Sequence, residues 1–390
     1  MISIETKNII IREFHRIRER KTLYIMMIFL PIFISLLYGY IYKNEIVREL
    51  PIAIFDEDHS SLSRTVIEFV ESAASMKVSG YVNSLDELKE GFRVGKYQGA
   101  FYLPHNMEND VKKGKNTTVI IYKNTSNLIV GNVLLRDGAQ IIKTVSAGAI
   151  IKKLTSKGMM YDQAMNIANP IKVETQSLYN ANYSYLSYLV PGLLAFTLQF
   201  IIMISAVIVI SSEFTHETFP ELLKISKNNI YKILIGKSLP HMLVHISSAI
   251  LILFIIFPFF NIHITGSIII TFLFFVLFIA SCLSVGLFIS SAFHNQLFAT
   301  ELALFINTPA FIFSGYTFPI WAMPKIHQIF AALLPFTHFV SGFLKIYQMD
   351  SPVSNALREI IVLSAFTIGG IILTIIALKL HVKKYYNIKV

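Results

Sequence analysis

Long apolar runs without Asp, Glu, Lys or Arg recur along the chain and predict membrane-spanning helices. The first run is Thr22–Tyr42. The second, Thr175–Ser212, opens with a belt of tyrosines and continues as a span through Ile210. The others are Ser238–Thr300, which holds two spans separated by Asn261–Gly266; a fifth span from near Leu297 to the Gly315–Pro319 break; and a sixth at Ile360–Leu378. A helix needs roughly 20 apolar residues to cross about 30 Å of hydrocarbon. Six spans would place both termini on one side of the membrane.

The first apolar run follows a basic segment, a combination that also occurs in signal peptides. However, the run is too long for the apolar part of a signal peptide, and it ends in Tyr38–Tyr42 without a small-residue cleavage site. We therefore interpret residues 22–42 as a retained membrane anchor.

Charged residues gather in residues 43–174, which hold 17 Lys/Arg and 15 Asp/Glu. Short apolar segments alternate there with amphipathic ones, predicting strands at 51–56, 77–82, 99–103 and 118–123 and helices at 60–72, 85–93 and about 127–156. Ser84 is the expected N-cap of the helix at 85–93. The sequence thus predicts a polytopic α-helical membrane protein with six transmembrane helices and an α/β domain inserted at residues 43–178.

Composition agrees with a membrane protein. Of the 390 residues, 54% are hydrophobic and only 15% charged, and the mean hydropathy is +0.58. A soluble enzyme usually has about a quarter of its residues charged. The net charge of +10 lies in the ends and loops without a nucleic-acid motif, so we expect no nucleic-acid partner.

Lys and Arg in the short loops indicate the orientation, because positive charge is retained in the cytoplasm. The basic residues on the expected inner side are Lys7, Arg12, Arg16, Arg18, Arg20 and Lys21; then Lys224, Lys227, Lys232 and Lys237; and finally Lys379, Lys383, Lys384 and Lys389. The opposite loops hold none in 261–266 and three in 319–358. We predict cytoplasmic termini and an extracytoplasmic segment 43–178, in the inner or plasma membrane.

Residues 1–21 have apolar side chains at helical spacing among Arg and Glu: Ile4, Ile10, Ile11, Phe14 and Ile17. This pattern predicts an amphipathic helix lying flat at the inner membrane surface. The alternative is a solvated basic leader.

The predicted cytoplasmic loop 213–226 is too polar to enter lipid and too short to form a domain. Phe214, Leu222 and Leu223 are its apolar anchors. A helix of this kind can dock into a groove on a soluble motor protein. An ordinary interhelical loop is an equally good interpretation of the residues alone.

Three intramembrane polar residues are candidates for chemistry. His241 and His245 share one helical face at i, i+4, but without a third ligand they suit a polar seam between helices better than a metal site. Glu301 is the one acid in the apolar stretch Ser238–Pro324; it is either functional or simply hydrated near the cytoplasmic end of its span. We find no catalytic or metal-ligand arrangement. Gly236–Ser238 resembles the end of a phosphate-binding loop but lacks the earlier glycine.

With these parts in this order, the chain resembles the permease subunit of type 2 ABC exporters, in the subgroup with an external domain after the first span. The segments that carry the resemblance are Leu189–Gly192, Glu213–Ser226, Gly236–Lys237, Phe313–Pro319 and Leu334–His338, with Leu85–Leu88 through Gly99–Phe101 in the outer domain. A departure is Thr215–Glu217, where the family usually has a second charged pair and a glycine.

The resemblance implies that the chain is a half-transporter, which pairs with a second copy or a sister permease. Five further helices are expected in residues 179–390. Two separately encoded ABC ATPases would carry ATP and Mg, so that this chain itself binds no cofactor. The resemblance assigns ATPase coupling to Glu213, Phe214, Glu217, Thr218, Leu222, Leu223 and Ser226. It assigns gate or structural roles to Pro191, Gly192, Gly315, Pro319, Pro324 and Pro335, and an outer re-entrant segment to residues 316–350.

We therefore predict the membrane subunit of an ATP-driven exporter of a lipophilic, drug-like or lipid-linked substrate, surrounded by membrane lipid. The competing interpretation is a membrane-anchored receptor or scaffold whose outer domain binds a partner. The sequence leaves open whether that domain docks onto a periplasmic adaptor.

Overall fold

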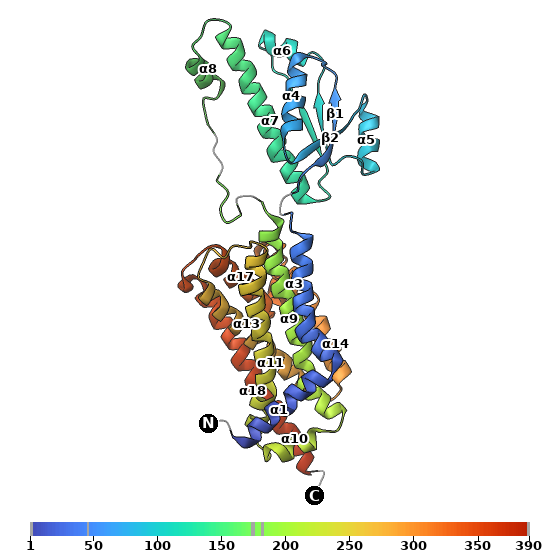
Figure 1. The fold of residues 1–390 in the computed structure, drawn as a ribbon, viewed down its shortest axis with the longest axis vertical. Coiled ribbons are helices and arrows are strands. Elements are labelled where there is room, and N and C mark those ends of the chain that lie inside the picture. The colour runs from blue at the N-terminus through green and yellow to red at the C-terminus, as the bar shows by residue number, and fades with distance from the viewer. Residues whose placement is uncertain (1–2, 45–46, 173–175, 181–182, 388–390) are drawn as a thin grey trace. The chain divides into compact units, whose positions relative to one another are not determined.

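A computed structural model describes residues 3–44, 47–172, 176–180 and 183–387 of the chain (Figure 1). Thr175 and Lys389, which entered the sequence analysis, lie outside the described residues. The chain divides into two compact units: residues 46–177 form an α/β unit, and residues 1–45 together with 178–390 form a helical unit.

The α/β unit contains each strand and helix that the sequence predicted, and two further helices. Its elements are β1 (Leu50–Asp56), α4 (Ser61–Ser72), β2 (Met76–Tyr81), α5 (Leu85–Arg93), β3 (Gly99–Leu103), α6 (Met107–Lys113), β4 (Ile120–Lys123), α7 (Leu128–Thr155) and α8 (Tyr161–Ala168). The Ser84 side chain accepts a hydrogen bond from the backbone N–H of Glu87. Ser84 is therefore the N-cap of α5, as predicted. Helices α6 and α8 were not predicted.

The four strands form one mixed sheet in the order β2-β1-β3-β4. Strand β1 pairs in parallel with β2 and β3, whereas β3 and β4 are antiparallel. Alternate side chains of β1 enter opposite cores, because neighbouring residues of a strand face opposite sides of the sheet. Ile52 and Ile54 pack with α4 and α7, and Ala53 and Phe55 pack with α5. The sheet thus lies between α4 and α7 on one face and α5 on the other (Figure 1).

The helical unit is built from long apolar helices joined by short ones. Its α-helices are α1 (Ile4–Glu19), α2 (Lys21–Tyr24), α3 (Leu30–Ile41), α9 (Tyr185–Thr215), α10 (Phe219–Ser226), α11 (Ile230–Ile250), α12 (Phe257–Phe259), α13 (Ile268–Ala292), α14 (Gln296–Asn307), α15 (Ala310–Phe313), α16 (Lys325–Ala332), α17 (Pro335–Phe343) and α18 (Leu357–Asn387). The π-helical stretches Ile25–Phe29, Leu251–Ile256 and Leu344–Gln348 continue some of them, and Ile320–Ala322 and Val353–Ala356 are 3-10 helices.

Six helical stretches among the described residues are long and apolar enough to cross a membrane. They are Lys21–Ile41, Tyr185–Thr215, Ile230–Phe259, Ile268–Ala292, Gln296–Phe313 and Val353–Lys383. A bent pair, Lys325–Ala332 with Pro335–Gln348, passes the same test together and turns by 86°. The chain is thus a multi-pass helical membrane protein, and the bend falls within the predicted outer segment 316–350.

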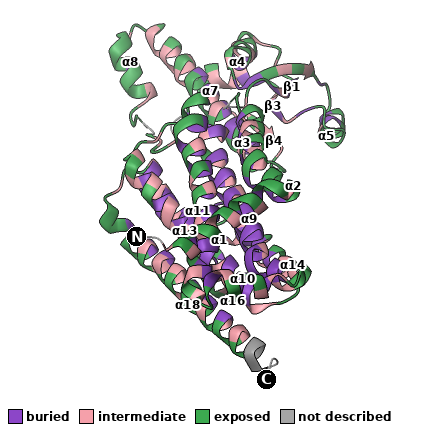
Figure 2. Cartoon of the chain, turned by 60° about the horizontal axis from the view of Figure 1, so that its bottom comes forward, coloured by how far each residue is buried: buried purple, intermediate pink, exposed green. Residues whose placement is uncertain are grey.

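Burial is uneven among these helices. The most apolar part of α9 is 67% buried, whereas that of the last stretch is only 17% buried. Figure 2 shows the same contrast, with buried residues concentrated along α9 and exposed residues along α18. Helix α9 is therefore the central helix of the unit.

Helix α1 buries a different stripe from the one its apolar residues suggested. Thr6, Ile9, Glu13 and Ile17 face the rest of the unit, while Ile4, Ile11 and Phe14 are exposed. Spacings of three and four residues place the first set on one helical face. The predicted helix is present, but Ile17 packs against its own protein, and a glutamate occupies the centre of the buried face.

Candidate functional site

The candidate site lies where α1 crosses the neighbouring ends of α9, α10 and α11. At the closest approach, a Cβ atom added to Gly236 of α11 would lie 2.6 Å from Cγ2 of Ile9. Any larger residue at position 236 would therefore push α1 away. The close approach brings Glu13 of α1 within reach of charged side chains on α11.

A buried ionic cluster joins α1, α9 and α11. The Nζ atom of Lys237 lies 2.5 Å from Oε2 of Glu13, and it also forms an ion pair with Glu213 at the end of α9. The Lys237 and Glu213 side chains are 0% exposed and that of Glu13 is 3% exposed. His241 Nε2 lies 3.1 Å from the other carboxylate oxygen of Glu13. Lys237 thus forms ion pairs with two helices that are distant in sequence, α1 and α9.

Two arginines of α1 complete the cluster. Arg12 donates two hydrogen bonds of 3.1 Å to the two Glu213 oxygens, a bidentate arrangement. Arg16 forms an ion pair with the same carboxylate and donates to the Ser212 hydroxyl at 2.6 Å. Burial opposes ionisation of Glu13, but the positive charges of Lys237 and Arg16 and the contact with His241 outweigh it, so the pKa of Glu13 lies below its usual range.

A second, more exposed contact fixes the start of α1. Glu5 lies 2.6 Å from Nζ of Lys227, just after α10, and 3.1 Å from Nζ of Lys232 on α11. The Lys227 hydrogen bond is the main reason that the pKa of Glu5 lies below its usual range. Helix α1 is therefore held at both ends to the segment that surrounds α10.

The predicted coupling segment divides into the end of α9, a turn and α10. Glu213 and Phe214 belong to α9, which extends past Ile210 to Thr215, and Glu217 forms the exposed turn with a left-handed φ of 58°. The Thr218 hydroxyl hydrogen-bonds to the Glu213 carboxylate and so ties the start of α10 to the ionic cluster.

The apolar residues of α10 face inward. Leu222, Leu223 and Ser226 are buried in the helical unit, and the Phe214 ring lies 4.6 Å from that of Phe219 and 4.7 Å from that of His294. These side chains therefore position α10 on its own protein, and they are not free to fill a groove on a partner. The exposed side chains of α10 include Glu221 and Lys224.

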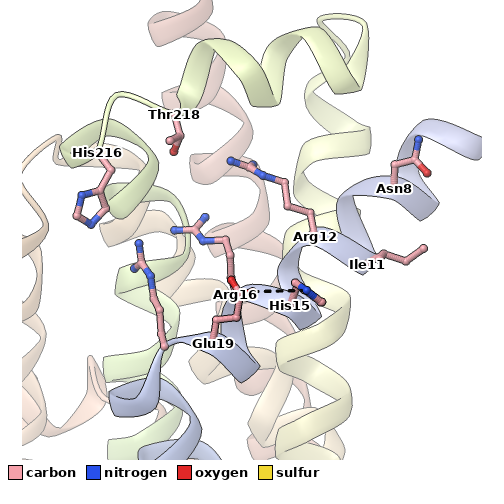
Figure 3. Close-up of a pocket in the computed structure, with 9 residues that line it drawn as sticks. Asn8, Ile11, Arg12, His15, Arg16, Glu19, His216 and Thr218 are labelled. Carbon is pink, nitrogen blue, oxygen red and sulfur yellow. Dashed lines mark ion pairs between the residues drawn. The ribbon is translucent and has the colours of Figure 1, made fainter.

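A basic pocket of about 700 Å³ opens beside the ionic cluster. It is lined by Asn8, Ile11, Arg12, His15, Arg16, Glu19, Arg20, His216 and Thr218. Figure 3 shows Arg12 and Arg16 reaching from α1 toward the loop that carries His216 and Thr218. Arg12, Arg16 and Arg20 line the pocket with one acid, Glu19, although Arg12 and Arg16 also pair with the Glu213 carboxylate of the ionic cluster.

Two candidate gate segments meet at the other end of α9. A Cβ atom added to Gly192 would lie 2.5 Å from the Tyr316 ring, which stacks on Tyr188 with a centroid distance of 5.5 Å. Each tyrosine hydroxyl donates to the backbone carbonyl of the other. Gly315 precedes Tyr316 with a left-handed φ of 85°. The segments around Gly192 and Gly315 therefore pack directly against each other.

The candidate prolines have separate positions in the fold. Pro191 lies inside α9 and is buried. Pro319 and Pro324 precede the short helices Ile320–Ala322 and α16, and Pro335 opens α17. Proline is favoured at the first helical position, where Pro335 lies, because its fixed φ suits the first turn and its missing N–H is not needed there.

The candidate intramembrane polar residues have different environments. His245 Nε2 lies 2.9 Å from the Ser205 hydroxyl of α9, and His241 contacts Glu13, so both histidines connect helices as the polar-seam interpretation predicted. No group of three metal-binding side chains occurs among the described residues. Glu301 is exposed on α14, and the structure brings it to neither the ionic cluster nor the gate segments.

A family model described as ABC-2 family transporter protein matches residues 21–376. The chain belongs to this family. The resemblance to this family that was inferred from the sequence is therefore confirmed.

This ABC-2 subunit is similar to two curated proteins of Escherichia coli (strain K12). It is 27% identical over 202 residues to "Probable multidrug ABC transporter permease YbhR", a match that covers 51% of this chain and 55% of YbhR. It is 22% identical over 349 residues to "Probable multidrug ABC transporter permease YbhS", covering 86% of each. The chain thus spans about half the length of YbhR in the match between them.

Sequence analysis of the ABC-2 subunit missed the principal buried polar contacts. Lys237, which was counted as a loop lysine, lies inside α11 and is fully buried. The pattern Lys237, His241, His245 at intervals of four is a signal that these residues share one buried helical face. Gln199 donates to Asn307 at 2.9 Å between α9 and α14, and Lys345 lies 2.7 Å from Glu359; no local pattern indicated either pair.

Proposed function

We propose that this chain is the transmembrane half of an ATP-driven exporter, powered by two separately encoded ATPases that bind ATP and Mg. The observation that carries the proposal is how α10 is attached to the rest of the helical unit. Its apolar side is packed on its own protein, its start is tied to the ionic cluster through Thr218, and it presents Glu221 and Lys224 outward. A rigidly mounted helix with an exposed polar face is suited to transmit a push from a docked motor.

The structure supports a path for that push. Motion of α10 passes to α9 through the contacts of Thr218 with Glu213 and of Phe219 with Phe214. Helix α9 is joined to α14 at two levels, by Gln199 with Asn307 and by the Thr215 hydroxyl, which accepts from the backbone N–H of Gln296 at 3.0 Å. We propose that α9 and α14 move together to open the route outward.

We propose that a second permease, identical or a sister, packs against α14. The exposed side chains of this fifth stretch include Leu297, Phe305 and Ile312, and Glu301 lies among them. A carboxylate on a membrane helix is costly against lipid. A partner subunit or a substrate path would provide the polar environment that Glu301 needs.

The substrate we propose is a lipophilic, drug-like or lipid-linked compound moved out of the cytoplasm or the inner leaflet. The similar proteins are named multidrug permeases. Helices with few exposed charges suit apolar cargo.

Affinity purification from the native membrane in mild detergent tests the transporter function. We expect an ABC ATPase to co-purify at one copy per permease and to hydrolyse ATP. Any sister permease or periplasmic adaptor in the same eluate would be identified by mass spectrometry. A clean preparation without an ATPase would contradict the proposal and favour a receptor or scaffold.

The proposed orientation puts both termini in the cytoplasm and the α/β unit outside. Lys89 is exposed on α5 and Lys224 on α10, so cysteines at these positions should react with an impermeant maleimide from opposite sides. We expect Lys89→Cys to label in intact cells and Lys224→Cys only after lysis. The wild-type protein is the control, because its single cysteine, Cys282, is buried. Labelling of Lys89→Cys only after lysis would overturn the orientation.

A further inference from the structure

The α/β unit contains two adjoining cavities on the α7 side of its sheet. The first, of about 870 Å³, is bounded by α4, α6 and α7, and the second, of about 450 Å³, also reaches α8. They share a wall formed by Leu62, Val111, Val145, Ala149 and Lys153. Because the wall is common to both, they form two chambers of one site.

The second chamber is predominantly apolar. Its lining includes Val66, Met107, Ile142, Ile150 and Leu154. Aliphatic side chains in a concave site favour a hydrocarbon group, since transfer of such a group from water to an apolar environment is favourable. This chamber fits an alkyl or acyl chain.

The first chamber is strongly basic. Lys112, Lys113, Lys152, Lys153 and Lys157 line it, against one acid, Glu108. Glu108 pairs with Lys112 at 3.1 Å, and no ion pair holds Lys113, Lys152 or Lys157 within the described part of the chain. Lys153 donates to the backbone carbonyl of Val111 at 3.2 Å, which places its ammonium group at the shared wall.

Gly148 leaves the first chamber open. It lies within the long helix α7, and a Cβ atom added there would meet no atom within 4 Å. Glycine inside a helix is less favourable than alanine. No neighbouring atom requires glycine at this position, so its effect is to keep the chamber unfilled.

We propose that the two chambers bind a single-chain anionic amphiphile, with its acidic head at the lysines and its hydrocarbon chain in the apolar chamber. Charge complementarity selects the acidic head, because the close lysines attract an anionic group. The lining of the second chamber selects the chain. This binding site is independent of the proposed transport function, since it is built from residues of the α/β unit alone.

Photolabelling of the full-length protein tests the site. The protein is placed in phosphatidylcholine nanodiscs and irradiated with a diazirine analogue of palmitic acid, and the labelled peptides are identified by mass spectrometry. We expect labels on α4, α6 and α7. Laurate should compete for them at least about tenfold better than dodecylphosphocholine or dodecyltrimethylammonium, a difference of about 1.4 kcal/mol.

Two variants and one matched control separate specific binding from misfolding. Lys113→Glu, Lys152→Glu and Lys157→Glu together should lower labelling about tenfold, and Gly148→Trp should lower it by filling the first chamber. Lys143→Glu reverses one lysine charge, as each of the three substitutions does, at an exposed position of α7 that lines neither chamber. It should label like the wild type.

Several results would overturn the proposal. Labels confined to the membrane-spanning helices would do so, as would equal competition by the anionic and zwitterionic amphiphiles. Undiminished labelling of both variants would also contradict it. If lysophosphatidylglycerol, an anionic lipid with one acyl chain, suppresses labelling as well as laurate does when it is added to the nanodiscs, the same chemistry is supported with a membrane lipid as the source.

Discussion

Replacing Lys237 with methionine is expected to destabilise the helical unit by about 3–5 kcal/mol, the usual cost of removing one partner from a buried ion pair. Lys237 is fully buried between Glu13 and Glu213. Methionine has a similar length but carries no charge, so Glu13 would keep only His241 at 3.1 Å and Arg16 at 3.7 Å. The loss can be measured as a lower SDS midpoint for unfolding from mixed micelles.

Lys232→Met is the matched control for this prediction. Lys232 lies on the same helix and also pairs with a glutamate of α1, but the pair is partly exposed, and Glu5 retains Lys227 when Lys232 is removed. Exposed pairs contribute little to stability. Equal stability of the Lys237→Met and Lys232→Met proteins would show that the buried cluster is not needed to hold α1.

A double variant distinguishes loss of charge balance from loss of packing. Glu13→Gln combined with Lys237→Met removes one negative and one positive charge and leaves a chain of similar volume. Residues in one network do not contribute additively. We therefore expect the double variant to be more stable than Lys237→Met alone. A double variant that is as unstable as the sum of the two single variants would assign the effect of Lys237 to packing.

The sequence predicted features that depend on nearby residues. Apolar runs such as Thr22–Tyr42 predicted spans because the hydrocarbon thickness sets the length of a membrane helix. The short apolar run at residues 51–56 predicted β1, because a run of this length fits a strand that is buried on both faces. Helix α8 (Tyr161–Ala168) escaped prediction because its eight residues are too few to establish a helical period.

The ionic cluster could not be predicted because its members are far apart in the chain. Glu13 and Lys237 are brought together by the approach of α1 to Gly236, which is a tertiary contact. The same contact explains why α1 buries Glu13 together with Ile9 and Ile17, while Ile4, Ile11 and Phe14 stay exposed. An unpaired carboxylate would be too costly there, whereas one held by Lys237 and His241 is tolerated.

The coupling segment illustrates a related limit. Apolar residues in a short polar loop predict that their side chains are buried. They do not indicate whether the same chain or a partner protein buries them. Leu222 and Leu223 are covered by the chain itself, so aspartate at either position would bury a charge and impair folding. A test of coupling must therefore change the exposed residues of α10.

Reversing the exposed charges of α10 is expected to abolish ATP-driven export while leaving the protein folded. Glu221→Lys and Lys224→Glu change side chains that are exposed in this subunit, and substitutions of this kind usually alter stability by less than about 0.5 kcal/mol. At a docked ATPase, each would place like charges together, which costs several kcal/mol. We expect at least a tenfold fall in transport by proteoliposomes that contain the co-purified ATPase.

Two further proteins make this test specific. Asp86→Lys reverses an exposed charge on α5 of the α/β unit and should transport normally. The double variant with Glu221→Lys and Lys224→Glu keeps the net charge of α10 but exchanges the positions of its negative and positive charges. It should not export if the ATPase contacts depend on where each charge lies. Normal export by both single variants and by the double variant, with the ATPase still bound, would show that α10 does not carry the coupling.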